Sequence, residues 1–501
     1  MGIPYYFYTL TKSYGNIITN VLPINPDIYC MDFNGVIHPI CAKLATNDEE
    51  KIIKELYIKV EKDIMLLKPK KTMICIDGIV PVSKMIQQRK RRYLTVYRNK
   101  IDNIKPIWDT NAITPATNFM NKLDTYFKKQ IRYNTTDSEI IFSGSNEYGE
   151  GEHKIFKKLR AEKQDINIII NGLDADLIIL CLLSHRKNIF LMRQQDNKDD
   201  MFVNINNLRD AIIKELTKRW QIPTIDDNYS NDAKNVIESY CVMCSLLGND
   251  FIPHILTLNL KTDGLDRLIS LTGNSYNTIG LLVQDSTINY MVLSDILQQL
   301  AKTEDKDIYK ETERYIKNRY HNTQTGLKSD YYAIKNKDPI ASDIYSDIEK
   351  WRNVYYKKIF NTNIAIDSSV INSACNQYIT GIYWTYAYYK NKPYDNTWYY
   401  PYTYPPTIKD ISNYTLGNPE PILKDKQVRL VPIIQLMIVL PFESKHLIDT
   451  RYQKYMEDTK YGLYHLYPKS YNIHTYMKTH LWECAPCLPN INIDYIKNNI
   501  L

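Results

Sequence analysis

The stretch Ile166-Asn167-Ile168-Ile169-Ile170-Asn171-Gly172-Leu173-Asp174-Ala175-Asp176-Leu177 decides the fold. Its first part, Ile166 to Ile170, is a short apolar run of the kind that predicts a buried strand. Two aspartates follow, and then an apolar helical stretch from Leu177 to Leu183. A buried strand, a polar turn and a helix form the repeating unit of a parallel sheet covered by helices.

The same unit recurs along the first half of the chain. Four more apolar runs predict buried strands, at Ile28 to Met31, Thr72 to Ile76, Glu139 to Phe142 and Ile189 to Met192. Amphipathic helical patterns lie between them. The sequence therefore predicts an α/β fold with a mostly parallel sheet flanked by helices.

The length of the chain, 501 residues, favours two packed units over one. We expect the α/β domain to occupy residues 1–275. Residues 346–501 form a second segment, rich in Trp, Tyr and Pro, which we expect to be largely helical and to cover the active-site entrance. Residues 276–345 turn polar and charged from about residue 300, which predicts a linker or a helical hairpin.

Acidic residues follow the predicted strands. Asp32 and Asp77 each come directly after one strand, and Asp174 and Asp176 come after a third. Carboxyl ends of parallel strands converge on one crevice, so acids at these ends should meet there. With the acids of the Gly149-Glu150-Gly151-Glu152-His153 and Gly248-Asn249-Asp250 runs, the candidate set is Asp32, Asp77, Glu150, Glu152, Asp174, Asp176 and Asp250.

Seven carboxylates in one crevice repel each other, and their pKa values rise unless cations are present. Mg²⁺ or Mn²⁺, which prefer oxygen ligands, are the expected cations. Two such ions about 3.5–4 Å apart suit phosphodiester hydrolysis. For any single aspartate the alternative is a helix N-cap, and Asp176 is the most cap-like because a helix follows it directly.

A basic segment follows the Asp77 strand end. In Lys84-Met85-Ile86-Gln87-Gln88-Arg89-Lys90-Arg91-Arg92, helical spacing places Lys84, Gln88, Arg91 and Arg92 on one face. Two guanidinium groups, an ammonium and an amide suit a terminal phosphate. The alternative is a solvated basic helix, and Arg89 and Lys90 do lie off this face.

Composition sets broader bounds. The formal net charge is +7, and the segment from Lys84 to Lys105 alone carries as much, which indicates a polyanionic partner. The longest apolar run, Leu177 to Leu183, is too short to cross a bilayer, so no membrane association is expected. No secretory segment precedes the nine scattered Cys, which predicts a reducing, cytoplasmic setting. The pair Cys241 and Cys244 lies in an apolar helical pattern and is expected in the core.

Taken together, these motifs resemble the Xrn-type 5′→3′ exoribonucleases. The resemblance rests on runs that occur in the family's order: Met1 to Pro4, Met31 to His38, Ile76 to Pro81, Lys84 to Arg92, Asn111 to Thr117, Phe142 to Gly144, Gly149 to Lys154, Gly172 to Leu177 and Gly248 to His254. A second block around Trp398 and Gln435 extends it over nearly the whole chain. The sequence departs from the family at Gly35, Tyr148 and Thr403, and ends soon after the second block, so a compact member is expected.

The resemblance implies a flap-endonuclease or PIN-like nuclease core and roles for individual residues. The seven acids match the family's metal ligands, and the four residues on the basic helical face match its 5′-monophosphate pocket. His38 matches a residue that stacks on the terminal base. Trp398 is the chosen aromatic counterpart, with Trp384 as the second choice; the alternative for either tryptophan is a core position.

The expected function is therefore 5′→3′ exoribonuclease activity. A monomeric enzyme would bind single-stranded RNA with a 5′-monophosphate and hydrolyse it processively to nucleoside 5′-monophosphates by two-metal-ion catalysis. Three alternatives remain open: a flap-type DNA nuclease, an inactive RNA-binding scaffold, which would tolerate loss of the acids although none is lost here, and a basic structural protein. The last of these leaves the acids unexplained.

Overall fold

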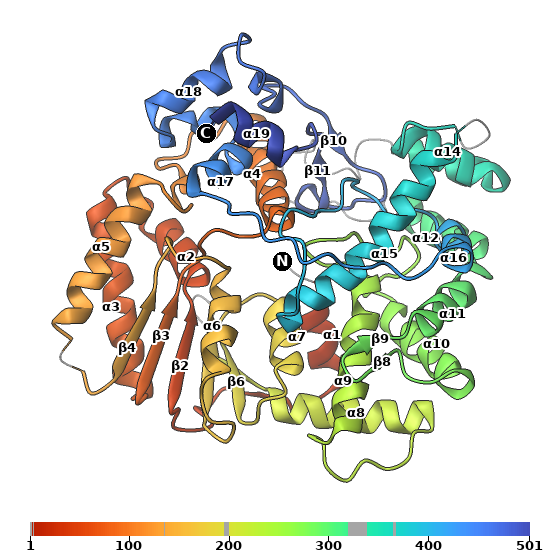
Figure 1. The fold of residues 1–501 in the computed structure, drawn as a ribbon, viewed down its shortest axis with the longest axis horizontal. Helices are drawn as coiled ribbons and strands as arrows, with labels where there is room; N and C mark the ends of the chain where they lie inside the picture. The colour runs from red at the N-terminus through yellow and green to blue at the C-terminus, as the bar shows by residue number, and fades with distance from the viewer. Residues whose placement is uncertain are drawn as a thin grey trace.

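The computed structural model describes residues 3, 5–134, 136–194, 200–318, 338–363 and 367–500. Its centre is a seven-stranded sheet with the order β1-β7-β6-β5-β2-β3-β4 (Figure 1). The strands are β1 (Ile18–Thr19), β2 (Ile28–Asp32), β3 (Lys71–Cys75), β4 (Glu139–Ser143), β5 (Ile168–Asn171), β6 (Ile189–Arg193) and β7 (Met201–Asn204).

The five strands from β6 to β4 run parallel; at one edge β7 pairs antiparallel with β6, and β1 pairs antiparallel with β7. All five are the strands predicted from apolar runs, although β5 begins at Ile168 rather than Ile166. The α/β class with a mostly parallel sheet is therefore confirmed. The sequence did not predict β1 and β7, because two and four residues at a sheet edge carry little apolar pattern.

Helices cover both faces of the sheet because the strand side chains alternate between two cores. In β2, Ile28 and Cys30 belong to one core, and Tyr29 and Met31 belong to the other. The first core is closed by α1 (Tyr6–Ser13), α6 (Gly151–Leu159), α7 (Asp176–Leu183), α8 (Ile205–Trp220) and α9 (Asn231–Cys244). The second is closed by α2 (Asn34–Leu44), α3 (Glu49–Leu67) and α5 (Asn118–Arg132).

The middle of the chain packs onto the first of these cores. Its elements are α10 (Gly264–Thr278), β8 (Val283–Gln284), β9 (Thr287–Ile288), α11 (Tyr290–Ala301), α12 (Glu304–Asn318) and α13 (Pro339–Ser346). Buried side chains such as Leu282 and Leu297 belong to the same core as α9. The helix α10 crosses the expected boundary at residue 275, and the three-part division of the chain stays a prediction.

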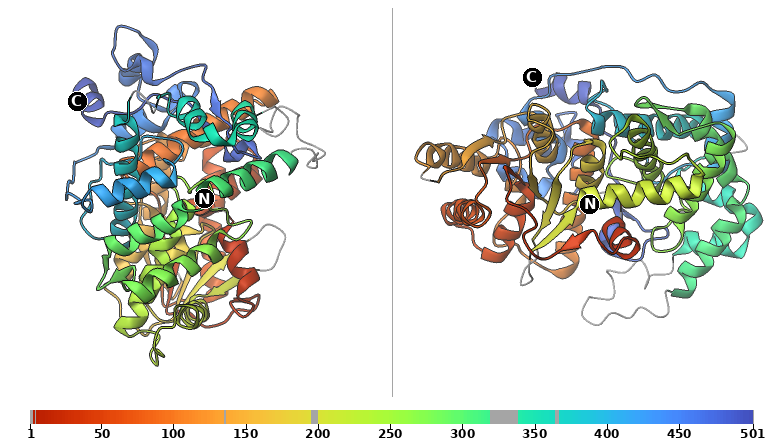
Figure 2. Two further views of the ribbon diagram at one scale, coloured as in Figure 1. Left: turned by 90° about the vertical axis from the view of Figure 1, so that its right-hand side faces the viewer. Right: turned by 90° about the horizontal axis from the view of Figure 1, so that it is seen from below.

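The remainder of the chain is mainly helical. It contains α14 (Trp351–Ile359), α15 (Ser369–Lys390), α16 (Ile408–Gly417), α17 (Pro432–Val439), α18 (Thr450–Glu457), β10 (Ile473–His474), β11 (Ala485–Pro486) and α19 (Ile493–Ile500). The helices α17 to α19 lie at the same end of the molecule as the basic helix α4 (Val82–Asp102) (Figures 1 and 2). Val82 and Met85 of α4 share a third core with Ile434 and Met437 of α17.

Candidate active site

The seven predicted acids lie at the carboxyl edge of the sheet and beside it. Asp32 is the last residue of β2, and Asp176 is the first residue of α7. Asp77 and Asp174 lie in the turns after β3 and β5, Glu150 and Glu152 at the start of α6, and Asp250 shortly after α9. Three strand ends and two further segments thus contribute acids, as the sequence pattern predicts.

Burial and the charges of neighbouring acids raise the pKa values of Asp32 and Glu152. Burial raises the pKa of Asp32 well above its usual range, and the charges of Asp77 and Asp174 raise it further. Burial likewise raises the pKa of Glu152, and Glu150 adds to the effect. Such mutual effects require the carboxylates to lie close together in a water-poor environment.

Asp176 shows most directly that the carboxylate oxygens of this cluster suit a bound cation. Burial and the charge of Asp250 raise the pKa of Asp176 to about 7. Its Oδ1 is buried and has no hydrogen-bond partner within the described part of the chain. A buried carboxylate oxygen without a donor is a suitable ligand for a hard divalent ion, so the cluster fits a divalent metal requirement.

Lys84 of α4 is a cation inside this cluster. Its Nζ lies 2.6 Å from Oε2 of Glu150 and 2.9 Å from Oδ2 of Asp250. Although burial opposes ionisation of Asp250, the charge and hydrogen bond of Lys84, together with other cations such as Arg91, hold the pKa of Asp250 well below its usual range. Lys84 therefore joins the acids to the helix that carries the predicted phosphate pocket.

Backbone contacts fix the strand-end acids. The N–H of Gly151 donates to Oδ1 of Asp77 at 2.8 Å, and the N–H of Asp77 donates to Oδ1 of Asn34 at 3.0 Å. A Cβ at residue 151 would lie 2.6 Å from Oδ1 of Asp32 and 2.8 Å from the carbonyl oxygen of Cys75. Glycine is required there because α6 approaches both strand ends so closely.

Helix α15 contributes two tyrosines that sequence reasoning missed. The hydroxyl of Tyr388 donates to Oε1 of Glu150 at 2.5 Å. The hydroxyl of Tyr389 is buried and has no hydrogen-bond partner among the described residues. Burial raises the pKa of Tyr389, and the charges of Asp176 and Glu152 raise it further, so this ring faces the same acids.

His153 also lies beside the acids. One ligand atom each from Glu150, Glu152 and His153 lie within 4.8 Å of one another, a spacing that could hold a metal ion. The ring of His153 stacks on Tyr388 with centroids 3.9 Å apart, and its Nε2 is buried without a partner in the described chain. The sequence signal that could have identified His153 as a site residue is its position directly after Glu152 in the Glu-x-Glu-His run.

The predicted phosphate face of α4 carries unsatisfied polar atoms. Oε1 of Gln88 and Nη1 of Arg92 are buried and lack hydrogen-bond partners in the described residues. Burial lowers the pKa of Arg92 to about 10. Arg91 is exposed one residue earlier on the same side of the helix. Guanidinium donors such as those of Arg91 and Arg92 suit an anion with several oxygens.

The two cations of α4 that lie off the predicted phosphate face, Arg89 and Lys90, do not form a solvated surface. Arg89 is 1% exposed, and its guanidinium donates to the carbonyl oxygens of Ile438, at 3.2 Å, and Leu466. Lys90 is half-buried. The first turns of the helix are therefore embedded, with Arg89 facing the C-terminal segments and Lys84 facing the acids, and the alternative of a helix with solvated cations on every side does not hold for these two residues.

The two residues expected to stack on a base differ in their surroundings. His38 of α2 is accessible to solvent, and surrounding protein atoms and the charges of Arg91 and Arg92 lower its pKa to about 4. Trp398 is half-buried and donates its indole N–H to Oε1 of Gln377 at 2.8 Å. Trp384, the second choice, is completely buried and exposes no face to a base.

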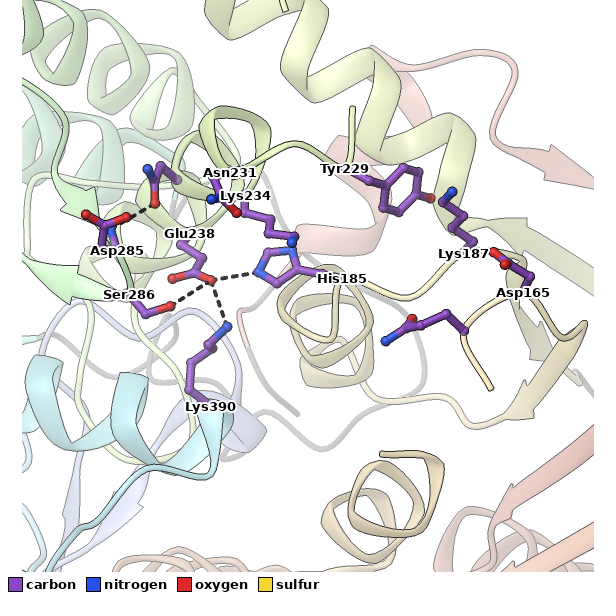
Figure 3. A pocket seen from close by; sticks show the side chains of 12 residues that line it. Asp165, His185, Lys187, Tyr229, Asn231, Lys234, Glu238, Asp285, Ser286 and Lys390 are labelled. Carbon is purple, nitrogen blue, oxygen red and sulfur yellow. Dashed lines mark hydrogen bonds and ion pairs between the residues drawn. The ribbon is translucent and has the colours of Figure 1, made fainter. Parts of the chain in front are cut away.

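A separate cavity of about 550 Å³ lies around Glu238 of α9 (Figure 3). Glu238 accepts hydrogen bonds from His185 and Lys390, both at 2.7 Å, and from Tyr386. Burial opposes ionisation of Glu238, but these donors hold its pKa well below its usual range. Tyr386 and Lys390 belong to α15, so this network anchors the helix end that carries Tyr388.

Acids at the carboxyl edge of an α/β sheet, beside a cationic helix, form the arrangement expected of a phosphodiesterase that uses divalent ions. Residues 1–195 match the family model described as XRN 5′-3′ exonuclease N-terminus. Residues 230–349 and 335–499 match the one described as Xrn1 helical domain, which alone covers more than half of the chain. The chain belongs to the XRN 5′-3′ exonuclease family, and the resemblance seen in the sequence is confirmed.

Curated relatives agree with this assignment. The 5′-3′ exoribonuclease 1 of Homo sapiens is 26% identical over 98% of this chain and 33% of its own length. The 5′-3′ exoribonucleases 2 of Gallus gallus and Candida albicans are 22% and 23% identical, over 98% of this chain and 69% and 71% of theirs. This chain thus spans a third of the human protein.

A solved structure of a bacteriophage T5 flap endonuclease, in a pseudo-enzyme–product complex with DNA and metal ions, aligns with 77% of this chain and 99% of its own. Its sequence identity is 10% and its TM-score 0.27, a likeness too slight to carry an argument.

Proposed function

We propose that this chain hydrolyses single-stranded RNA processively from a 5′-monophosphate end and releases nucleoside 5′-monophosphates. The observation that carries the proposal is the position of Lys84, which contacts the acids Glu150 and Asp250 from the helix that also carries Gln88 and Arg92. A phosphate held by that helix would lie beside the acid cluster, at a fixed distance from the bond to be cut.

The acids are the proposed metal ligands. Asp32, Asp77, Glu150, Glu152, Asp174, Asp176 and Asp250 would hold two Mg²⁺ ions, with Mn²⁺ as the alternative. When bound, such ions activate water and stabilise the leaving oxygen. The chain's own residues set the geometry: Gly151 and Asn34 orient Asp77, and Tyr388 orients Glu150.

The substrate end is held by α4 and α2. Gln88, Arg91 and Arg92 would donate to the terminal phosphate, with Lys84 between that phosphate and the acids. His38, with its pKa lowered to about 4, is neutral near pH 7 and can offer its ring to the first base. Trp398 is the proposed second stacking residue. Because it is partly buried, the alternative is that it packs in the core.

Two other activities use the same acids. A flap-type DNA nuclease would cut branched DNA, and an inactive scaffold would bind RNA without cutting it. The buried guanidinium nitrogen of Arg92, which has no hydrogen-bond partner among the described residues, favours an enzyme that selects an end with a phosphate. Among the described residues no helix could span a membrane; a monomeric state and a cytoplasmic location stay predictions.

The test is incubation of the purified chain and Mg²⁺ with RNAs that differ only at the 5′ end. We expect monophosphorylated RNA to yield nucleoside 5′-monophosphates from the first time points, 5′-hydroxyl RNA to react slowly, and capped or triphosphorylated RNA to resist. Early internal fragments, equal rates on all ends, or preferential cutting of branched DNA would each contradict the proposal.

A further inference from the structure

A cavity of about 490 Å³ lies next to the acid cluster and is separated from it by two side chains, the rings of His153 and Tyr388. The hydroxyl of Tyr388 donates to Oε1 of Glu150 at 2.5 Å, and a ligand atom of His153 lies within 4.8 Å of one from Glu150 and one from Glu152. The two rings stack with centroids 3.9 Å apart. They therefore form a partition with the acids on one side and the cavity on the other.

The charge of this cavity is opposite to that of the acid cluster. Lys154, Lys157 and Arg429 line it, and among the described residues no acidic side chain does. Lys154 is buried and donates to the carbonyl oxygens of Ile76 and Gly144, at 2.7 and 2.8 Å. Lys157 and Arg429 are exposed and form no ion pair within the described part of the chain. A cationic cavity beside an anionic centre attracts an anion that the centre repels.

The rest of the lining suits a nucleoside. Two tyrosine rings, Tyr148 and Tyr394, lie in the wall, and Tyr148 is 56% exposed. Asn391 and Gln427 add exposed amide groups. On the inner side, Nε2 of His153 is buried and has no partner among the residues that the structure describes. Rings stack on bases, amides bind base edges, and cations bind phosphate, so the chemistry of the cavity fits a mononucleotide.

The outer wall is a segment without helix or strand, residues 418–431, between α16 and α17. Asn396 holds this segment through its side chain, which donates to the carbonyl oxygen of Val428 at 2.9 Å and accepts from its N–H at 3.0 Å. The hydroxyl of Tyr148 donates to the carbonyl oxygen of Leu430 at 2.6 Å. The exposed cations and amides lie at the mouth of the cavity, and the partition lies at its floor. The cavity thus leads from the acids to solvent.

We propose that the nucleoside 5′-monophosphate released at the acids leaves through this cavity. The partition consists of side chains rather than backbone, so rotation of His153 and Tyr388 opens it. The phosphate moves from the acids toward Lys157 and Arg429, and the base passes the tyrosine rings. This inference rests on the proposed function: a processive enzyme keeps its strand on the phosphate face of α4, so the product needs a route that the strand does not fill. No residue of that face, from Lys84 to Arg92, lines the cavity.

The first test measures binding of adenosine 5′-monophosphate (AMP). The phosphate face of α4 is first filled with a 5′-monophosphorylated RNA whose first linkage is non-hydrolysable. Wild-type protein should still bind AMP, and Arg429→Ala and Lys157→Ala should each weaken this binding by about 10- to 150-fold, the loss of one charge-assisted contact. Lys163→Ala, which removes an exposed cation outside the cavity, is the matched control and should bind like wild type. Absence of AMP binding to the RNA-filled wild-type protein would overturn the proposal.

The second test is steady-state cleavage of long RNA in the presence of added AMP. Because AMP fills the exit, it should lower kcat without raising KM, and Arg429→Ala should resist this inhibition. Single-turnover cleavage by Arg429→Ala should equal that of wild type, since Arg429 does not lie among the acids. A rise in KM at unchanged kcat, or a loss of single-turnover rate in Arg429→Ala, would contradict an exit here. Failure of the proposed function is distinguishable: wild-type protein would then release no mononucleotide from RNA, whereas the AMP-binding test requires no hydrolysis.

Discussion

The hydroxyl of Tyr388 donates a hydrogen bond to Oε1 of Glu150, 238 residues earlier in the chain. It comes from the last turn of α15, a helix that Glu238 anchors through Tyr386 and Lys390. The geometry of a carboxylate at the start of α6 thus depends on a helix from the second half of the protein.

Tyr388→Phe should therefore weaken metal binding while leaving the fold intact. Loss of a group that orients a metal ligand typically costs about 10- to 100-fold in metal affinity. A Mg²⁺ titration of cleavage rate measures this shift. Tyr383→Phe, which removes a hydroxyl of the same helix that contacts Glu420 at the surface, is the control and should titrate like wild type.

Glu152→Gln and Asp176→Asn should each lower cleavage by several orders of magnitude, because each removes a proposed metal-ligating charge. RNA affinity should persist, since α4 and the stacking residues are untouched. Gel-shift and single-turnover assays separate the two effects. Near wild-type cleavage by both variants in Mg²⁺ would show that the metal assignment is wrong.

The stability gain from Mg²⁺ should grow with pH. Asp176 has a pKa of about 7 in the folded chain against 3.8 ordinarily, so the folded state binds the extra proton and loses stability as pH rises between these values. Mg²⁺ replaces that proton. Thermal melts should show a larger Mg²⁺ shift at about pH 8 than at about pH 5, and a smaller pH effect in Asp176→Asn. Equal shifts at both pH values would contradict this.

Arg91→Glu should erase the preference for a 5′-monophosphate. Charge-assisted hydrogen bonds contribute about 1.5–3 kcal/mol, so kcat/KM on monophosphorylated RNA should fall about 10- to 150-fold. The rate on 5′-hydroxyl RNA should change far less. Arg98→Glu is a suitable control because Arg98 lies on the exposed part of the same helix. A uniform loss on both ends would point to general electrostatics instead.

His38→Ala and Trp398→Ala should reduce processivity more than the first cleavage, at a cost of about 1–3 kcal/mol per stacked base. Product-length distributions under single-encounter conditions measure this. If Trp398→Ala instead lowers the melting temperature sharply while His38→Ala does not, Trp398 is a packing residue of the aromatic layer around Trp384.

The sequence was sufficient to predict the strands of the central sheet and the positions of the acids at their ends, because both are local patterns. Each of the five parallel strands is an apolar run, and Asp32, Asp77 and Asp174 follow three of them. The edge strands β1 and β7 carry too few residues to show a period. Burial of Trp384 and exposure of Trp482 depend on which segments dock against each ring, and sequence spacing does not contain that information.

Tyr388 and Arg89 were missed for a related reason. The chain has 42 tyrosines, so one more in Tyr386-Ala387-Tyr388-Tyr389 carries no signal of its own. For Arg89, helical spacing shows that it lies off the predicted phosphate face. It does not show that the guanidinium donates hydrogen bonds to two backbone carbonyls from distant segments.

The hydrogen bonds of Arg89 also imply a delay during synthesis, between the appearance of α4 and the appearance of the segments that bury it. Its acceptors, Ile438 and Leu466, lie 349 and 377 residues further along the chain. At synthesis rates of about 5–20 residues per second, α4 would wait roughly 20–70 s for the segments that bury it. During that interval the guanidinium of Arg89 lacks both of its carbonyl acceptors, and the proposed phosphate-binding face of α4 is made before the second half of the protein that encloses it.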